Sequence, residues 1–313
     1  MPAPEAPMRL LGEHGCASRG AAERAGARVH GISGMRTLRG MRTAWSRLGT
    51  VLMMLLAGSA AAVELRWREG TVRGYPVMVD PATGKVVAWG EHVQRVVGNR
   101  LLVSTVFKFN DGRRIEEQLE LDQGQQLSQR KWLWREKVGG DLRREFRVDF
   151  TTGQASAIKV ENATRQEWKG KVDVKAGEAF AGAGFMFAIK NVTERLREGE
   201  SVELTAVAFM PKPRTVKVKV FAQGKDTVRV AGRNLPADHI IVRPQVPWVA
   251  KAFVKVPDHH LWFHSTPPAA FLRAEGMLME PSDMVVRTEV EAPVGNGARR
   301  AARAAPAEKR AAP

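Results

Sequence analysis

From Val63 onward, apolar and polar residues alternate in short runs that are separated by glycine-containing turns. Phe146, Val148 and Phe150, for example, alternate with charged residues, and a Thr-Thr-Gly turn follows them. A period of two places the apolar side chains on one face of a β-strand. Successive strands joined by short turns form antiparallel meanders, so this pattern predicts a mainly β protein.

The pattern changes once, near residues 180–198. Apolar residues there recur at spacings of four, three and four, at Phe185, Ile189, Val192 and Leu196. This spacing is typical of an amphipathic helix, and Gly199 is a natural stop for it. Strand-like alternation then returns, and Gln223–Asp226 is predicted to form a hairpin turn.

These elements predict a single domain over residues 63–292. We expect a strongly bent antiparallel sheet or open β-barrel of about ten strands. The amphipathic helix is expected to pack on the concave face of that sheet, because its apolar stripe needs a partner. No proline- or serine-rich linker divides this region, which favours one domain over two.

The segment 41–62 has the layout of a secretory signal peptide. Arg42 and Arg47 precede an apolar run of about ten residues, and small residues follow it at 58–62. A run of that length is shorter than the ~20 residues needed to cross a bilayer, which favours cleavage over a retained anchor. Cleavage after Ala60, Ala61 or Ala62 would satisfy the small-residue rule equally.

Ser59 follows a Leu-Leu-Ala-Gly sequence that resembles the box preceding the lipidated cysteine of bacterial lipoproteins. Serine has no thiol to receive the lipid. The sequence therefore predicts a bacterial protein that is soluble after signal cleavage, periplasmic or secreted, and not lipid-anchored. Residues 1–40 are expected to be disordered or to precede the true start at Met41, and the Ala/Arg/Pro tail at 293–313 is expected to be disordered.

Charge and cysteine content narrow the chemistry. The formal charge is +16, and the basic tail could make weak contact with anionic envelope surfaces. We expect no nucleic-acid partner because the protein is predicted to be exported. Cys16, the one cysteine, lies upstream of the signal, so the exported part has no disulfide and no thiolate.

No common catalytic or phosphate-binding motif is present: the sequence contains neither G-x-S-x-G, H-E-x-x-H nor a P-loop. We therefore expect a protein that is not an enzyme and that needs no cofactor or metal. The alternative is a metal-dependent or other hydrolase that uses the histidine-rich C-terminal region, with His260, His264 and Asp258 as ligands. Along a strand, however, His260 and His264 would lie about 13 Å apart.

Aromatic residues indicate where an apolar or lipid-like small molecule could bind. Indole and phenyl rings on a curved sheet can line a cavity beneath a helix. The candidate lining residues are Trp132, Trp134, Phe185, Phe187 and Ile189. The same residues could instead fill the core between sheet and helix, and the pattern alone leaves both interpretations open.

The segment from Phe263 to Gly276, with Pro267 and Pro268 in a loop before the last strands, resembles the close of an uncharacterised family of exported bacterial β-rich proteins. Those chains have a signal peptide, a meander, a central helix and a second meander. The chain is more loosely similar to LolA/LolB-type periplasmic half-barrels, which carry lipoproteins in an apolar cavity. That resemblance implies a sheet wrapped around a helix, although those carriers have several helices where this chain has one.

Overall fold

The computed structural model describes residues 62–210, 212–245 and 256–291. The chain separates into two compact units, residues 1–55 and 56–313, and all described residues belong to the second. The predicted upstream segment, signal peptide and basic tail lie outside the described residues. So does most of the strand that the alternation suggests at 252–256.

The described residues form one open sheet of fifteen strands and one α-helix. The strands are β1 (Val72–Val79), β2 (Val86–Val97), β3 (Arg100–Phe109), β4 (Arg113–Gln123), β5 (Leu127–Val138), β6 (Asp141–Asp149), β7 (Gln154–Glu161), β8 (Thr164–Lys171), β9 (Ala179–Phe180), β10 (Ser201–Met210), β11 (Lys212–Val230), β12 (Arg233–Pro244), β13 (His259–His264), β14 (Phe271–Met277) and β15 (Val285–Glu291). The helix, α1, spans Gly184–Arg197, inside the predicted range. The mainly β class is confirmed, whereas the expected number of about ten strands is wrong.

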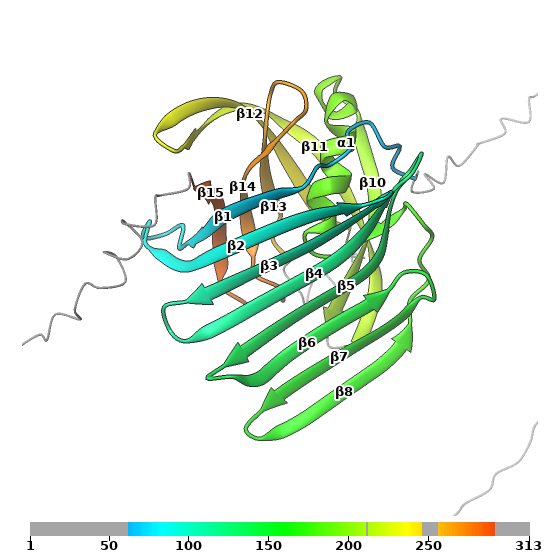
Figure 1. The fold of residues 1–313 in the computed structure, drawn as a ribbon, viewed down its shortest axis with the longest axis vertical. Coiled ribbons are helices and arrows are strands. Elements are labelled where there is room, and N and C mark those ends of the chain that lie inside the picture. The colour runs from blue at the N-terminus through cyan, green and yellow to red at the C-terminus, as the bar shows by residue number, and fades with distance from the viewer. Residues whose placement is uncertain (1–61, 211, 246–255, 292–313) are drawn as a thin grey trace, which may run out of the picture. The chain divides into compact units, whose positions relative to one another are not determined.

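Two antiparallel meanders meet in the middle of the sheet. The order is β8-β7-β6-β5-β4-β3-β2-β1-β15-β14-β13-β12-β11-β10-β9, so the first and last strands of the domain are neighbours (Figure 1). Tyr75 pairs with Glu291 and Val79 with Arg287 across this junction. Every pairing is antiparallel except that of the two-residue β9 with β10.

The strands missed by sequence reasoning carry weak alternation. β8 has the sequence TRQEWKGK, and only Trp168 is partly buried. As an edge strand it packs on the core through little more than that one side chain, so it has no apolar face to recognise. The hairpin predicted at Gln223–Asp226 is also wrong. Those residues lie inside β11 at a register shift between Ala222 and Gly224, and the chain turns later, at Ala231 and Gly232.

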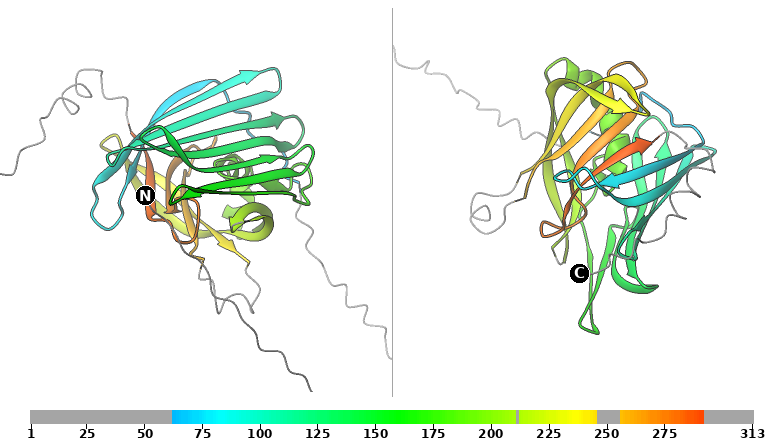
Figure 2. Two further views of the ribbon diagram at one scale, coloured as in Figure 1. Left: turned by 90° about the horizontal axis from the view of Figure 1, so that it is seen from below. Right: turned by 90° about the vertical axis from the view of Figure 1, so that its left-hand side faces the viewer.

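The sheet bends so that its two halves face each other with α1 between them (Figure 2). The inward side chains of both meanders and of the helix form one hydrophobic core. A row of stacked rings crosses it: Trp134 packs on Phe146, Phe146 on Phe209 and Phe209 on Trp132, with centroids 4.8–5.7 Å apart. Near the open edge, β7 and β8 lie against β11 without joining its ladder.

A buried ion-pair network ties the β14–β15 loop to the first meander. Arg144 of β6 donates hydrogen bonds to Glu136 on β5 (2.6 Å) and to Glu280 and Asp283 of the loop (2.9 Å each). Lys159 of β7 also pairs with Glu280. The Arg144 side chain is only 14% exposed, and its carboxylate partners raise its pKa in spite of the opposing effect of burial. Arg144 therefore bridges three acids that would otherwise repel each other, and Lys159 and Arg113 help to offset their charge.

Replacing Arg144 should destabilise the domain. We expect Arg144→Met, which keeps the apolar stem, to lower the free energy of unfolding by about 3 kcal/mol or more, because it leaves buried carboxylates without their partner. Urea unfolding followed by tryptophan fluorescence measures the change. Arg73→Met is the matched control, since the Arg73–Glu91 pair on β1 and β2 is exposed and should leave the midpoint unchanged. Equal midpoints for the two variants would contradict the role given to Arg144.

Candidate functional site

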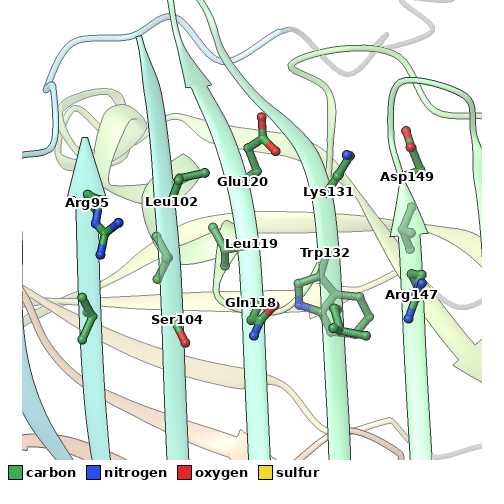
Figure 3. Close-up of a pocket in the computed structure, with 14 residues that line it drawn as sticks. Arg95, Leu102, Ser104, Gln118, Leu119, Glu120, Lys131, Trp132, Arg147 and Asp149 are labelled. Atoms are coloured by element: carbon green, nitrogen blue, oxygen red, sulfur yellow. The ribbon is translucent and has the colours of Figure 1, made fainter. Parts of the chain in front are cut away.

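A hollow of about 650 Å³ lies on the outer face of the first meander, across β2 to β6 (Figure 3). Strand pairing brings its side chains together in two parallel rows. One row is Val93, Ser104, Gln118, Leu133 and Arg147, and the other is Arg95, Leu102, Glu120, Lys131 and Asp149. Because side chains alternate between faces, the residues between the rows point inward into the core and offer the hollow mainly their backbone.

Three apolar side chains line the hollow on either side of β4, which contributes Gln118 and Glu120. Val93, Leu102 and Leu133 project from β2, β3 and β5 toward solvent, and Leu102 is 38% exposed. Their inward neighbours Val103 and Trp132 already fill the core. These outward apolar side chains therefore contribute little to folding, and a partner that covered them would gain free energy by removing apolar surface from water.

Charged residues also line the hollow, and cations outnumber acids among them. Arg95, Lys131 and Arg147 face Glu120 and Asp149. Glu120 is bridged from outside the hollow by Arg100 at 3.2 Å and Arg130 at 3.6 Å, which offsets its charge.

Within the part of the chain that the structure describes, the Arg95 side chain has no ion pair or hydrogen-bond partner. Arg147 is bonded to Glu145 at 3.1 Å but remains 54% exposed. The hollow therefore favours an anionic group at its rim.

The five residues predicted to line a cavity lie together between the sheet and α1. Trp132 and Trp134 project inward from β5, and Phe187 and Ile189 belong to α1; all four are at most 6% exposed and belong to one hydrophobic core. Phe185 is partly buried, and its ring lies 6.1 Å from that of Phe180. The structure thus gathers the predicted set in the core, and Trp132 also borders the outer hollow. A ligand cavity at this place stays a prediction.

A buried acid holds the start of α1 and was missed by sequence reasoning. Oε1 of Glu117, on the inner face of β4, accepts hydrogen bonds from Nε1 of Trp132 (2.7 Å) and from the backbone N–H of Ala183 (2.8 Å). The residue is only partly buried as a whole, but its carboxyl is enclosed, and burial raises the pKa more than the two hydrogen bonds lower it. The available signal was an acid between Ile115 and Leu119 on an apolar strand face.

Glycine is required where the chain enters the helix beside this acid. Gly182 has φ of +52°, and a Cβ there would lie 2.0 Å from Oε1 of Glu117. Gln129 binds the preceding residue twice, accepting from the Ala181 N–H at 2.7 Å and donating to its carbonyl at 3.2 Å. A Cβ at Gly184 would meet the Gln129 amide at 2.4 Å. These close contacts set the position of the helix against β4 and β5.

The residues of the predicted histidine site do not come together. Asp258 is bound by the guanidinium of Arg243 at 2.6–3.0 Å. His264 contacts the backbone of Thr266, and His260 contacts His239 instead. Among residues 62–210, 212–245 and 256–291, no three histidine, cysteine, aspartate or glutamate side chains gather in a way that could hold a metal ion.

Comparison with known proteins identifies no family. No family model and no curated protein matches the chain. The chain is similar to the crystal structure of a beta-barrel-like protein of the domain of unknown function DUF1849 from Brucella abortus, with a TM-score of 0.38, 11% identity and coverage of 71% of this chain and 96% of that one. It is also similar to the hypothetical lipoprotein YmcC from Escherichia coli K12, with a TM-score of 0.30, 12% identity and coverage of 71% and 84%.

Both neighbours are described as proteins of unknown or hypothetical function, and at this level of similarity no activity or site residue transfers to this chain. Neither description is that of a LolA/LolB-type carrier, so that resemblance stays a prediction. In the described part of the chain, no helix has the length and apolarity that a membrane crossing requires.

Replacing the ionisable carboxyl of Glu117 should change how the free energy of unfolding depends on pH. The folded-state pKa lies above the ordinary value of 4.5, so the carboxyl favours folding below that pH, and this contribution is lost as the pH rises through the raised pKa. Glu117→Gln keeps an oxygen that accepts both hydrogen bonds. We expect this variant to gain stability over the wild type between about pH 4 and pH 8, as measured by urea unfolding.

The adjacent Glu116 is a matched control of opposite sign. It points to the outer face. Burial raises its pKa, but the opposing effect of Arg114 and Lys137 is larger, so the pKa lies below its ordinary value. Glu116→Gln should therefore lose stability relative to the wild type as the pH rises above the ordinary value. Parallel pH profiles for the two variants would show that the Glu117 carboxyl is not held protonated by its surroundings.

Proposed function

We propose that this chain is an exported, non-catalytic protein of the bacterial cell envelope that binds a small, lipid-like anion in the outer hollow. The observation that carries the proposal is the combination, in one depression, of outward apolar side chains with more cations than acids. A molecule with an apolar body and an acidic head matches both parts.

The dimensions and chemistry of the hollow support a small ligand. Its volume of about 650 Å³ falls in the range of roughly 300–1,000 Å³ that small-molecule sites occupy. The apolar body would cover Leu102 and Leu133, and the acidic head would reach Arg95 or Arg147 at the rim. Arginine pairs with carboxylate and phosphate through two parallel hydrogen bonds, so it suits such a head group.

The location in the envelope rests on the sequence. The charge, apolar run and small-residue ending of segment 41–62 support export to the periplasm or medium. Ser59 in place of a cysteine supports a protein that is released rather than lipid-anchored. An amphipathic anion is a kind of molecule that such a compartment holds, because envelope lipids carry acidic head groups.

The sheet–helix interior is the second place where the same ligand could bind. There the lining would be Trp132, Trp134 and the helix residues Phe185, Phe187 and Ile189. In the structure the rings of Trp132, Trp134 and Phe185 pack on the core rings of Phe209, Phe146 and Phe180, so a ligand would have to displace them. The outer hollow needs no such rearrangement, and for that reason we place the ligand there.

Binding of 1-anilinonaphthalene-8-sulfonate, an apolar ring system with one anionic group, tests the site. We expect a saturable fluorescence increase that becomes about tenfold weaker in affinity in Leu102→Asn, because the buried apolar contact is lost. Arg147→Glu should weaken binding as well and reduce its dependence on salt. Val285→Asn is the matched control, since Val285 is an exposed apolar residue (42%) on β15, away from the hollow.

The interior alternative gives the opposite pattern. If Phe187→Leu alters the affinity for the probe and Leu102→Asn does not, the ligand lies beneath the helix and the outer site is wrong. If none of the variants changes the affinity, or if Val285→Asn weakens it as much as Leu102→Asn does, the outer hollow is not the binding site.

A further inference from the structure

Two histidines from neighbouring strands face each other on the outer side of the second meander. His239 on β12 pairs across the ladder with Trp262, and His260 on β13 pairs with Ile241, so the two imidazoles are diagonal neighbours on one face. Nε2 of His239 lies 2.9 Å from Nδ1 of His260, and the ring centroids are 5.2 Å apart. This is the geometry of a single N–H···N hydrogen bond, in which one ring donates and the other accepts.

The number of protons on the pair decides whether this bond can form. When both rings are neutral, one facing nitrogen carries a proton and the other offers its lone pair. One added proton, on the far nitrogen of the donating ring, makes that ring an imidazolium and strengthens the bond. A second added proton leaves an N–H group on both facing nitrogens, so no acceptor remains and two positive charges repel each other. The pair therefore accommodates one extra proton and rejects two.

Packing holds the His239 ring in place. It stacks on Trp262 with centroids 4.4 Å apart and planes 6° from parallel. The indole is fixed in turn, because its Nε1 donates to Asp226 at 2.7 Å. It also belongs to a small apolar cluster with Val228, Ala237 and Leu272. Rotation of His239 away from a charged His260 would therefore disrupt this stack.

The surroundings of His239 oppose its protonation. Burial is the largest effect that lowers its pKa, and the charge of His260 lowers it further. The negative charges of Asp226 and Glu275 raise the pKa of His239, but the lowering effects are larger. His239 is therefore the ring that stays neutral when the pair takes up its first proton.

The other charges near the pair are largely matched with each other. The Arg243 guanidinium binds Asp258 at 2.6–3.0 Å, and Glu289 offsets the charge of Arg273 at 2.8 Å. The charged or titratable groups around the pair are Asp226 on β11, Arg243 on β12, Asp258 and His259 at the start of β13, Arg273 and Glu275 on β14, and Arg287 and Glu289 on β15.

We propose that the His239–His260 pair is an acid-sensitive latch between β12 and β13. At neutral pH the N–H···N bond joins the outer faces of the two strands. In mild acid a second proton removes the acceptor, the bond breaks, and repulsion between the two imidazolium rings loosens the ladder at this point. The latch is separate from the outer hollow, which lies across β2 to β6, so it does not depend on the proposed function.

The latch makes stability depend on pH in one direction. The pKa of His239 in the folded protein lies below its ordinary value of 6.5, so the unfolded chain takes up this proton first as the pH falls. The contribution of the neutral ring to stability is complete above pH 6.5 and is lost as the pH falls through the lowered pKa. Burial also lowers the pKa of His92 and His259, so variants are needed to isolate the pair.

Long-range ¹H–¹⁵N nuclear magnetic resonance of the full-length protein tests the proposal, because it reports the charge of each imidazole. We expect His239 and His260 to titrate in two separate steps, with His239 charged last. In His260→Asn, which keeps a polar side chain that cannot be charged, the pKa of His239 should rise by about one pH unit. Urea unfolding should show that this variant loses less stability than the wild type between about pH 8 and pH 5.

Amide hydrogen exchange locates the opening. Protection factors, which are corrected for the intrinsic effect of pH on exchange, should fall in β12 and β13 of the wild type below about pH 6, whereas those of β3 and β4 should not. In His260→Asn the protection of β12 and β13 should not change over this range.

His264→Asn is the matched control, because His264 lies on the same strand and its side chain contacts the backbone of Thr266. It should leave the titration of His239 as in the wild type, and circular dichroism establishes that each variant is folded. A pKa of His239 that is the same in the wild type and in His260→Asn would overturn the coupling of the two rings. Separate titration steps with equal changes of protection in β12, β13, β3 and β4 would overturn the latch.

Discussion

The pairing of β1 with β15 is the interaction on which the rest of the structure depends. It joins the two meanders at the centre of the sheet, between residues that are more than 200 positions apart in the chain. Without it, each meander would be a separate sheet with an exposed edge at β1 or β15. With it, inward residues such as Met78 on β1 and Val286 on β15 belong to one core. The fold can therefore be completed only after both ends of the domain have been synthesised.

The two faces of the sheet carry different tasks. The inner face holds the stacked rings and the helix, and its polar exceptions, Glu117 and Gln129, both bind the backbone at the start of α1. Side chains on the outer face do not pack into the main core, so this face can carry exposed leucines, unpaired cations and facing histidines. The ion pairs of Arg144 then hold the β14–β15 loop against the first meander, so that the bent sheet keeps its curvature.

The sequence predicted the class of fold and the helix, because both rest on local periodicity. Phe185, Ile189 and Leu196 repeat at helical spacing whatever surrounds them. The predicted number of strands was too low because periodicity is weak in some strands, such as β8, whose side chains are mostly solvated. The turn expected at Gln223–Asp226 failed because a bulge uses the same glycine-rich residues as a hairpin does.

The sites were harder to predict than the fold, because strand register brings their residues together. Leu102 and Leu133 line one hollow only through the ladders of β3 with β4 and of β4 with β5. His239 meets His260 for the same reason, and no spacing along the chain indicates it. The five residues predicted to line a cavity belong to the core or pack against it, because amphipathicity places them on inward faces, and the cavity itself stays a prediction. The sequence signal for Glu117 was an acid in a row of apolar residues. Its hydrogen bond with the backbone N–H of Ala183 could not be inferred from that row.

An open sheet of this size carries a risk of association with other chains through its edges. The edge strand β8 presents Arg165, Glu167, Lys169 and Lys171 in alternation along its outer face, all of them exposed. A strand from another copy could pair there only by bringing its own side chains beside this charged row, and unfavourable charge contacts would oppose it. Because β8 also lies against β11, little of the edge is presented to other molecules. The polar composition that hid this strand from sequence reasoning thus disfavours strand pairing between copies of the protein.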